Sequence, residues 1–264
     1  MNGTPAILLG LLALGGCASA ATMPSSPTHA AGYLNPQRLE ALADTVPAPP
    51  PTGSAMDLTD RATSDRYRGL QGGDRWLLAT AHAELRPALA LTHFDCGLGT
   101  QMATAPVPQL TAIFEKVLHD ANEAAERVKA RSFRARPVGD DPTREACQRL
   151  TTAGRTTPSY PSGSAAVGAA YGEVLAELVP DRATETRRIG HEIAMSRVVC
   201  GMHYPSDVEA GEALGRTVAR EIVASPGYQV DRIAAQAELA AARTMGLSNP
   251  GCAAERAALA APLP

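Results

Sequence analysis

Three short segments, far apart in the chain, carry the residues that could bind a phosphate group and attack it. They are residues 129–137 (Lys-x6-Arg-Pro), 161–164 (Pro-Ser-Gly-Ser) and 196–207 (Ser-Arg-x5-His-x3-Asp). A lysine and two arginines can neutralise an oxyanion through charge-assisted hydrogen bonds. A histidine followed four residues later by a carboxylate can act as an oriented nucleophile. Together the three segments predict a site that binds and transfers phosphate.

The first segment ends a long amphipathic stretch and supplies two cations. Of the 24 basic residues only two are lysines, and one of them is Lys129. We predict that Lys129 binds phosphate, because a compact ammonium suits a crowded oxyanion. Pro137 restricts Arg136 to an extended backbone, which determines where Arg136 leaves the helix end. Arg131 and Arg134, between these positions, are predicted to lie on the surface.

The second segment precedes an apolar helical run that starts at Ala165. The unpaired N–H groups of a helix N-terminus bind anions, so Ser162 and Gly163 can offer a hydroxyl and backbone donors to phosphate. A plain serine cap followed by a turn glycine would have the same sequence. The presence of the other two segments favours the phosphate site.

The third segment places a histidine just before a predicted helix. Ser206 and Glu209 have the spacing of a capping box, so we expect a helix to begin near Asp207. His203 would then lie in the preceding loop. Asp207 can accept a hydrogen bond from one imidazole nitrogen and leave the other free to attack. Arg197, earlier in the segment, would make a bidentate contact with the phosphate oxygens.

This pattern resembles the signature of the phosphatidic-acid-phosphatase type 2 superfamily, which includes bacterial class A acid phosphatases, membrane lipid phosphatases and vanadium haloperoxidases. Every signature position matches except one, where Ser164 stands in place of histidine. Residues 94–99, 159–160 and 197–201 extend the likeness to class A acid phosphatases over residues 33–223. The resemblance implies an all-α, single-domain helical bundle of the class A acid phosphatase and haloperoxidase type.

The resemblance also implies the roles of the matching residues. His203 would be the nucleophile that forms a covalent phosphohistidine, which water then hydrolyses, and Asp207 would be its catalytic partner. The substrates would be small phosphorylated molecules, and the reaction would need neither a metal nor another cofactor. The implied phosphate-binding residues are Lys129, Arg136, Ser162, Gly163 and Arg197.

The departure at Ser164 bears directly on activity. The family histidine is thought to protonate the leaving-group oxygen, and a serine hydroxyl is too weak an acid for that task. Loss of a general acid typically costs about 10²–10⁴-fold in rate. We therefore expect an acid phosphatase that is slow or selective for good leaving groups, such as aryl phosphates. Candidates for a substitute acid are His191, His93, Asp140 and Asp141.

Two other functions remain open at this point. The missing histidine would also suit a non-catalytic protein that binds phosphate or phosphoesters. A vanadate-dependent haloperoxidase would use the same residues, because vanadate resembles a trapped phosphoryl transition state. Those enzymes normally carry the histidine as well, so its loss does not favour them.

The elements that must position these residues are expected to be helices. Residues 109–131 carry apolar side chains on one face and charged side chains on the other. Strand signals are scarce, because β-branched and aromatic residues nowhere alternate for long and aromatic residues are 4% of the chain. Further helices are expected near residues 55–70, 74–92, 164–178, 181–199, 206–224 and 228–246.

The N-terminal residues are predicted to direct export. Residues 1–20 are interpreted as a signal peptide, whose apolar core at residues 7–14 is too short to remain as a membrane span. Residues 14–17 resemble a lipobox, in which Cys17 would be lipidated and anchor the protein to a membrane. Residues 18–20 fit ordinary signal cleavage. The lipobox is slightly favoured, because a cysteine rarely occupies that position by chance. Either route predicts a periplasmic protein.

The rest of the chain is long enough for one domain with a sizeable core. We expect a flexible tether at 21–32, the helical phosphatase domain at 33–250 and a peripheral tail at 251–264. The net charge of −3, with acids and bases interspersed, gives no footprint for nucleic acid. The oligomeric state stays open, a homo-oligomer included.

Four cysteines remain after Cys17, namely Cys96, Cys147, Cys200 and Cys252. In an oxidising compartment an even set predicts two disulfides, for which three pairings are possible. A metal site is disfavoured, because no two of these cysteines have C-x2-C spacing.

Overall fold

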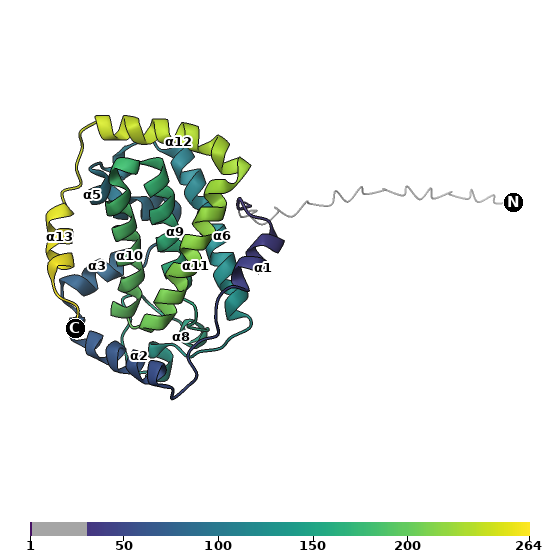
Figure 1. Ribbon diagram of the computed structural model, residues 1–264, viewed down its shortest axis with the longest axis vertical. Coiled ribbons are helices and arrows are strands. Elements are labelled where there is room, and N and C mark those ends of the chain that lie inside the picture. The colour runs from purple at the N-terminus through teal and green to yellow at the C-terminus, as the bar shows by residue number, and fades with distance from the viewer. Residues whose placement is uncertain (2–30) are drawn as a thin grey trace.

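Four long helices form the centre of the molecule (Figure 1). Helix α9 (Gly163–Leu178) is apolar and buried along most of its length, so it forms the middle of the bundle. Helices α6 (Pro108–Lys129), α10 (Ala183–Val199) and α11 (Pro205–Ala224) pack along it. The computed structural model describes Met1 and residues 31–264, and no strand occurs among them, which confirms the predicted all-α fold.

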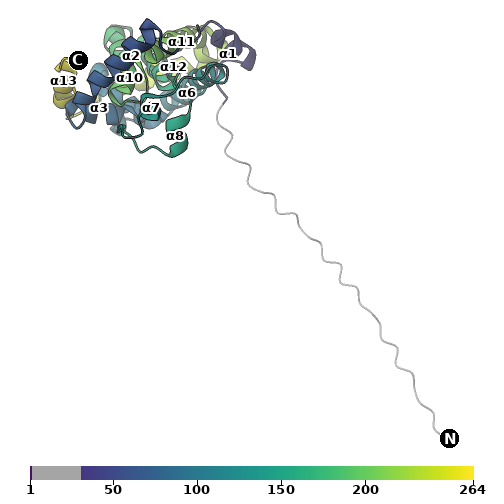
Figure 2. The ribbon, with the colours of Figure 1, turned by 90° about the horizontal axis from the view of Figure 1, so that it is seen from below.

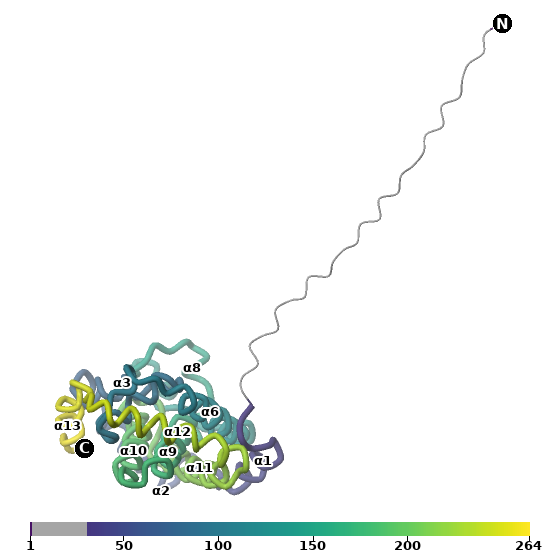
Figure 3. The backbone as a smooth tube through the Cα atoms, turned by 90° about the horizontal axis from the view of Figure 1, so that it is seen from above, coloured from purple at the N-terminus to yellow at the C-terminus, as the bar shows by residue number. Residues whose placement is uncertain are grey.

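Shorter elements surround this centre. Helix α12 (Pro226–Thr244) lies across one end of the bundle (Figures 1 and 3). Figure 2, the view from below, shows α7 and α8 next to each other. The other helices are α1 (Pro36–Ala43), α2 (Ala55–Arg66), α3 (Asp74–His82), α4 (Pro87–Ala90), α5 (Asp95–Leu98), α7 (Pro137–Asp140), α8 (Thr152–Thr156) and α13 (Cys252–Ala260). The described residues also form four 3₁₀ helices: η1 (Tyr67–Leu70), η2 (Leu91–Phe94), η3 (Met102–Thr104) and η4 (Pro180–Arg182).

The predicted helices agree with these bounds to within a few residues, with one clear exception. The stretch at 74–92 is not continuous, because α3 ends at His82 and α4 begins at Pro87. Arg86 has an extended backbone (ψ 134°), as expected for a residue that precedes proline.

Close helix contacts depend on glycine, as two of the positions illustrate. A Cβ atom added to Gly190 on α10 would lie 2.6 Å from the carbonyl oxygen of Gly168 on α9. A Cβ atom added to Gly215 on α11 would lie 2.1 Å from the carbonyl oxygen of Ala166. The three helix backbones therefore approach each other more closely than any side chain would allow.

The predicted disulfides are present, and the structure gives their pairing. Cys96 in α5 is bonded to Cys252 in α13, within the predicted tail. Cys147 is bonded to Cys200, which follows α10. The predicted signal peptide, Cys17 and most of the predicted tether lie outside the described residues. In the part of the chain that the structure describes, no helix has the length and apolarity of a membrane span.

The contact between α9 and α11 predicts a large effect of one methyl group. We expect Gly215→Ala to lower the free energy of unfolding by about 1–3 kcal/mol, because the helices must separate to admit it. Gly69→Ala is the control, since nothing lies within 4 Å of an added Cβ there. Urea unfolding checks both variants, and equal stability of the two would contradict this account of the packing.

Candidate active site

The end of the bundle opposite α12 brings the three predicted segments together (Figure 1). Helices α6 and α10 end there, with Lys129 and Arg197 in their last turns. Helices α9 and α11 begin there, so that Gly163 is the first residue of α9 and His203 lies just before α11. The alternating direction of the four helices is what places these residues on one side.

A cavity of about 240 Å³ opens at this end. Six of the predicted site residues line it, whereas Ser162 and Asp207 do not. The lining consists of Lys129, Arg136, Gly163, Ser164, Arg197 and His203, joined by Asn122, Gln148, Leu150, Gly154, Thr157 and Met202.

Neutral acceptors hold the guanidinium of Arg136. It donates from Nε to the carbonyl oxygen of Thr157 (3.1 Å), from Nη2 to that of Pro158 (3.2 Å) and from Nη1 to that of Met202 (3.1 Å). Nη1 also lies 2.8 Å from Nε2 of His203. No carboxylate is among these contacts, so Arg136 keeps its charge for the cavity.

The buried side chain of Arg197 has hydrogen-bond donors without an acceptor among the described residues. Its side chain is 3% exposed, and Nη2 donates to Oε1 of Gln148 at 3.1 Å. Nε and Nη1 are buried without a hydrogen-bond partner among the described residues. Burial, and to a lesser extent the charge of Arg136, lower the pKa of Arg197 to about 10. Unpaired buried donors are costly, which suits a site that an anion completes.

Lys129 lies beside the start of α9. Its Nζ atom is 3.4 Å from the position that a Cβ atom on Gly163 would occupy, so the glycine leaves room for the ammonium at the helix N-terminus. Glu126, half exposed on the rim, accepts from Nζ at 2.5 Å. Burial lowers the pKa of Lys129, while Glu126 opposes that shift.

His203 has the geometry of a neutral nucleophile. Nδ1 lies 2.8 Å from the carbonyl oxygen of Ser159, so Nδ1 carries the proton and Nε2 presents its lone pair to Arg136 and the cavity. The pKa of His203 is lowered well below its usual value, first by burial and then by Arg136, Arg197 and Lys129. The environment of His203 therefore favours the neutral form of the imidazole.

Asp207 does not contact the imidazole directly, contrary to the sequence-based expectation. Its Oδ2 atom is 3.9 Å from Nδ1 of His203. Instead, Oδ2 accepts from Oγ of Ser159 at 2.6 Å and from the backbone N–H of Tyr204 at 2.8 Å. The hydroxyl of Ser159 is 3.3 Å from Nδ1, so it stands between the carboxylate and the ring.

The start of α11 explains this difference. The predicted capping box of Ser206 and Glu209 is wrong, because the helix begins two residues earlier than Asp207, at Pro205. Proline favours the first helical position, where its missing N–H costs nothing. Asp207 is therefore the third helical residue, and its carboxylate turns back to cap the backbone N–H of Tyr204.

Arg134 was predicted to be a surface residue, and this is wrong. Its side chain is 6% exposed and donates to Asp207 (2.7 Å), Asp57 (2.9 Å) and Asp60 (2.8 Å). The two additional aspartates lie on α2, whose position against α11 the sequence does not reveal. Arg131 is exposed, as predicted.

Ser162 has the geometry of a helix cap. Its hydroxyl accepts from the backbone N–H of Ala165 at 3.2 Å, and its side chain is fully buried. Its own N–H donates to the carbonyl oxygen of Asp207 at 2.8 Å. Ser162 thus joins the start of α9 to the start of α11 behind the cavity.

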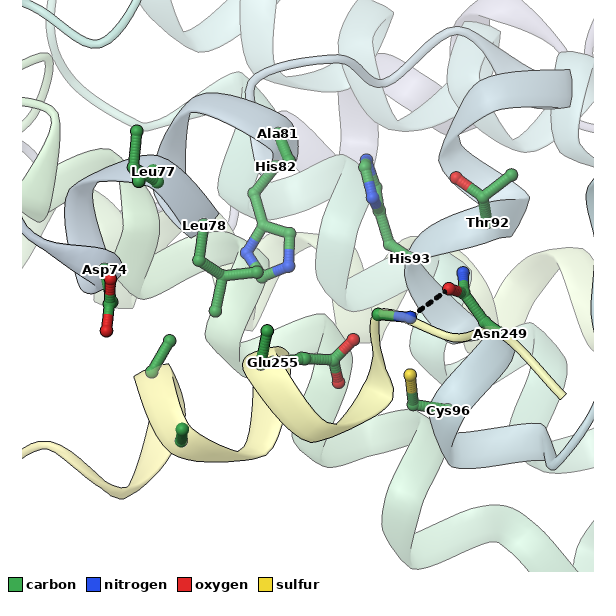
Figure 4. Close-up of a pocket in the computed structure, with 14 residues that line it drawn as sticks. Asp74, Leu77, Leu78, Ala81, His82, Thr92, His93, Cys96, Asn249 and Glu255 are labelled. Carbon is green, nitrogen blue, oxygen red and sulfur yellow. Dashed lines mark hydrogen bonds between the residues drawn. The ribbon is translucent and has the colours of Figure 1, made fainter.

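None of the candidates for a substitute acid lines the cavity. His191 pairs with a glutamate of α11, and Asp140 and Asp141 form ion pairs with arginines of α2 and η1. His93 lies with His82 in a separate cavity of about 430 Å³ between α3 and α13 (Figure 4). Apart from His203 and the three cations, the described lining residues of the candidate site carry no ionisable group.

Comparison with known proteins places these features in a family. Residues 111–231 match the PAP2 superfamily. The chain is 33% identical over 198 residues to an acid phosphatase of Zymomonas mobilis subsp. mobilis, which covers 75% of each chain. It is 30% identical over 204 residues to a non-specific acid phosphatase of Providencia stuartii, with 75% of this chain and 80% of that protein covered.

Among solved structures, the chain is similar to a transmembrane PAP2-type phosphatidylglycerolphosphate phosphatase from Bacillus subtilis. That match has a TM-score of 0.47 and 17% identity, and it covers 71% of this chain and 92% of the other. The identity to the two acid phosphatases, over three quarters of this chain, decides the assignment. The chain belongs to the PAP2 superfamily and is a homologue of the bacterial non-specific acid phosphatases.

Proposed function

We propose that this protein is an acid phosphatase that hydrolyses small phosphomonoesters through a covalent phosphohistidine on His203. The observation that carries the proposal is the buried imidazole of His203, which lines the same cavity as Lys129, Arg136 and Arg197. The curated relatives are named acid phosphatases, which supports the same reaction.

In the first step the phosphoryl group of the substrate occupies the cavity. The unpaired donors of Arg197 hydrogen-bond its oxygens, and Lys129 and Arg136 neutralise the remaining charge. Nη1 of Arg136 shifts its hydrogen bond from Nε2 of His203 to a phosphoryl oxygen, which frees the lone pair of Nε2. Nε2 then attacks phosphorus, a P–N bond forms, and the P–O bond to the leaving group breaks. Nδ1 keeps its proton and its hydrogen bond to the Ser159 carbonyl, which stabilises the positive ring.

The leaving group takes the electron pair of the broken bond. In relatives with a histidine at this position, that side chain would protonate it, but Ser164 has no acidic proton to give. An aryl oxygen can leave as an anion, whereas an alkyl oxygen must obtain a proton from water. The protein is therefore selective for good leaving groups.

In the second step water attacks phosphorus and the P–N bond breaks. The electron pair of that bond returns to Nε2, and phosphate and a proton are released. His203 is again neutral and ready for another cycle.

We also propose that the protein is exported to the periplasm, by ordinary signal cleavage or with a lipid anchor on Cys17. The Cys96–Cys252 and Cys147–Cys200 disulfides support an oxidising compartment.

Replacement of the nucleophile tests the mechanism. We expect His203→Ala to abolish hydrolysis of p-nitrophenyl phosphate, since no other lining residue can form the intermediate. In the wild type, mass spectrometry after acid-free quenching should find phosphate on His203. Turnover by His203→Ala, or phosphate on another residue, would refute the role of His203. Phosphate binding without turnover by the wild type would instead favour a binding protein.

Restoration of the missing acid tests the role of Ser164. We expect Ser164→His to raise kcat/KM for alkyl phosphates by about 10²-fold or more, because general acids contribute about 10²–10⁴-fold. Hydrolysis of aryl phosphates should change much less. The ratio of the two rates is the measurement, and an unchanged ratio would exclude this explanation of the substitution.

The environment of His203 predicts its titration. Burial and three neighbouring cations disfavour the imidazolium, so the midpoint should lie below the ordinary value of about 6.5. The nucleophile is then still available at a pH where an ordinary histidine is protonated. Histidine-selective NMR in phosphate-free buffer measures the midpoint, with His203→Gln to assign the signal. A midpoint at or above about 6.5 would contradict the proposed electrostatics.

A further inference from the structure

The amide of Gln148 is the sole hydrogen-bonding partner of the Arg197 side chain among the described residues. Nη2 donates to Oε1 of Gln148 at 3.1 Å, while Nε and Nη1 have no acceptor. A neutral amide can orient a guanidinium without cancelling its charge, whereas a carboxylate would compete with phosphate. Gln148 also lines the cavity, so any movement of its side chain changes both the position of the Arg197 side chain and the shape of the cavity wall.

The Cys147–Cys200 disulfide joins a residue next to Gln148 to a residue close to Arg197 in the chain. Cys147 directly precedes Gln148, and Cys200 follows Arg197 by about one helical turn. Residues 142–151 form no helix or strand, so regular backbone hydrogen bonds do not hold Gln148 in place. The disulfide is therefore the nearest covalent constraint on the pair.

We propose that Gln148 is a positioning residue that holds Arg197 in its phosphate-binding orientation, and that the Cys147–Cys200 disulfide keeps Gln148 against it. This inference rests on the proposed function, because it assigns Arg197 to the phosphate. It gives the disulfide a role in ligand capture beyond its contribution to stability.

Other contacts keep the segment attached when the disulfide is absent. Arg155 donates from Nη1 to the carbonyl oxygens of Val138 (2.9 Å) and Arg144 (3.1 Å). Arg144 donates from Nη2 to the carbonyl oxygen of Ser64 at 2.7 Å. A variant without the disulfide is therefore expected to fold, with Gln148 less well placed.

The first test changes Gln148 alone and measures the Kd of inorganic phosphate by calorimetry. We expect Gln148→Ala to weaken binding by about 10-fold, the size of a hydrogen bond to a charged group. Gln148→Glu should weaken it more, because its carboxylate competes with phosphate for Arg197. The thermal midpoint of both variants should stay near that of the wild type. A Kd unchanged in both variants would overturn the role of Gln148.

The second test asks whether the disulfide acts through Gln148. We expect Cys147→Ala/Cys200→Ala to weaken phosphate binding, and Gln148→Ala to add little in that background, because coupled residues are non-additive. The matched control is Cys96→Ala/Cys252→Ala, which removes the remote disulfide and should lower stability without changing Kd. Fully additive effects, or an equal loss of binding in the control, would overturn the role of the disulfide.

The outcomes also separate this inference from the proposed function. A wild-type protein that neither binds phosphate nor hydrolyses p-nitrophenyl phosphate would defeat the proposed function. A wild type that does both, with no loss of affinity in Gln148→Ala and Gln148→Glu, would defeat only the inference. If the variant without the disulfide fails to fold, the two Gln148 variants still decide the role of the amide.

Discussion

The candidate site depends on two buried arginines and a largely buried lysine that line one cavity, whose lining contains no carboxylate. Arg136 is held by backbone carbonyls and Arg197 by an amide, while the acid beside Lys129 lies on the rim. Neutral contacts orient the two arginines without neutralising their charge, whereas Lys129 is paired with Glu126. Their mutual repulsion and desolvation cost are then relieved when a phosphoryl group enters. The proposed affinity for an oxyanion would thus follow from the same arrangement that destabilises the empty site.

The acids of the site are separated from this cavity. The carboxylate of Asp207 forms an ion pair with Arg134, which also pairs with two aspartates of α2. Asp207 is connected to the His203 ring only through the hydroxyl of Ser159. A carboxylate bonded directly to the ring would raise the pKa of His203, whereas the surrounding cations and burial lower it. A lower pKa makes the imidazole a weaker base, but it keeps the lone pair of Nε2 available in acid.

The sequence predicted much of this arrangement, for identifiable reasons. Helix periodicity located the long helices, and the three motif segments, which include Lys129 and His203, predicted one shared site. The burial of Arg134 could not be predicted, because its partners come from α2, and helix positions depend on packing rather than local pattern. Nothing in the sequence indicated that Gln148 belongs to the site, apart from its place next to Cys147. Ser159 was noticed for its likeness to a family, but its place between Asp207 and His203 depends on where α11 begins.

Ser164 lies on a different element from the charged residues that we propose to bind phosphate. The groups that we propose to bind the phosphoryl oxygens come from α6, α10 and the segment before α7, whereas position 164 lies in the first turn of α9. A change there leaves Lys129, Arg136 and Arg197 in place, since none of them contacts Ser164 through a hydrogen bond. In the proposed mechanism, phosphate binding and attack by His203 therefore persist without protonation of the leaving group by the protein. The acidity of the leaving alcohol would then decide which esters react.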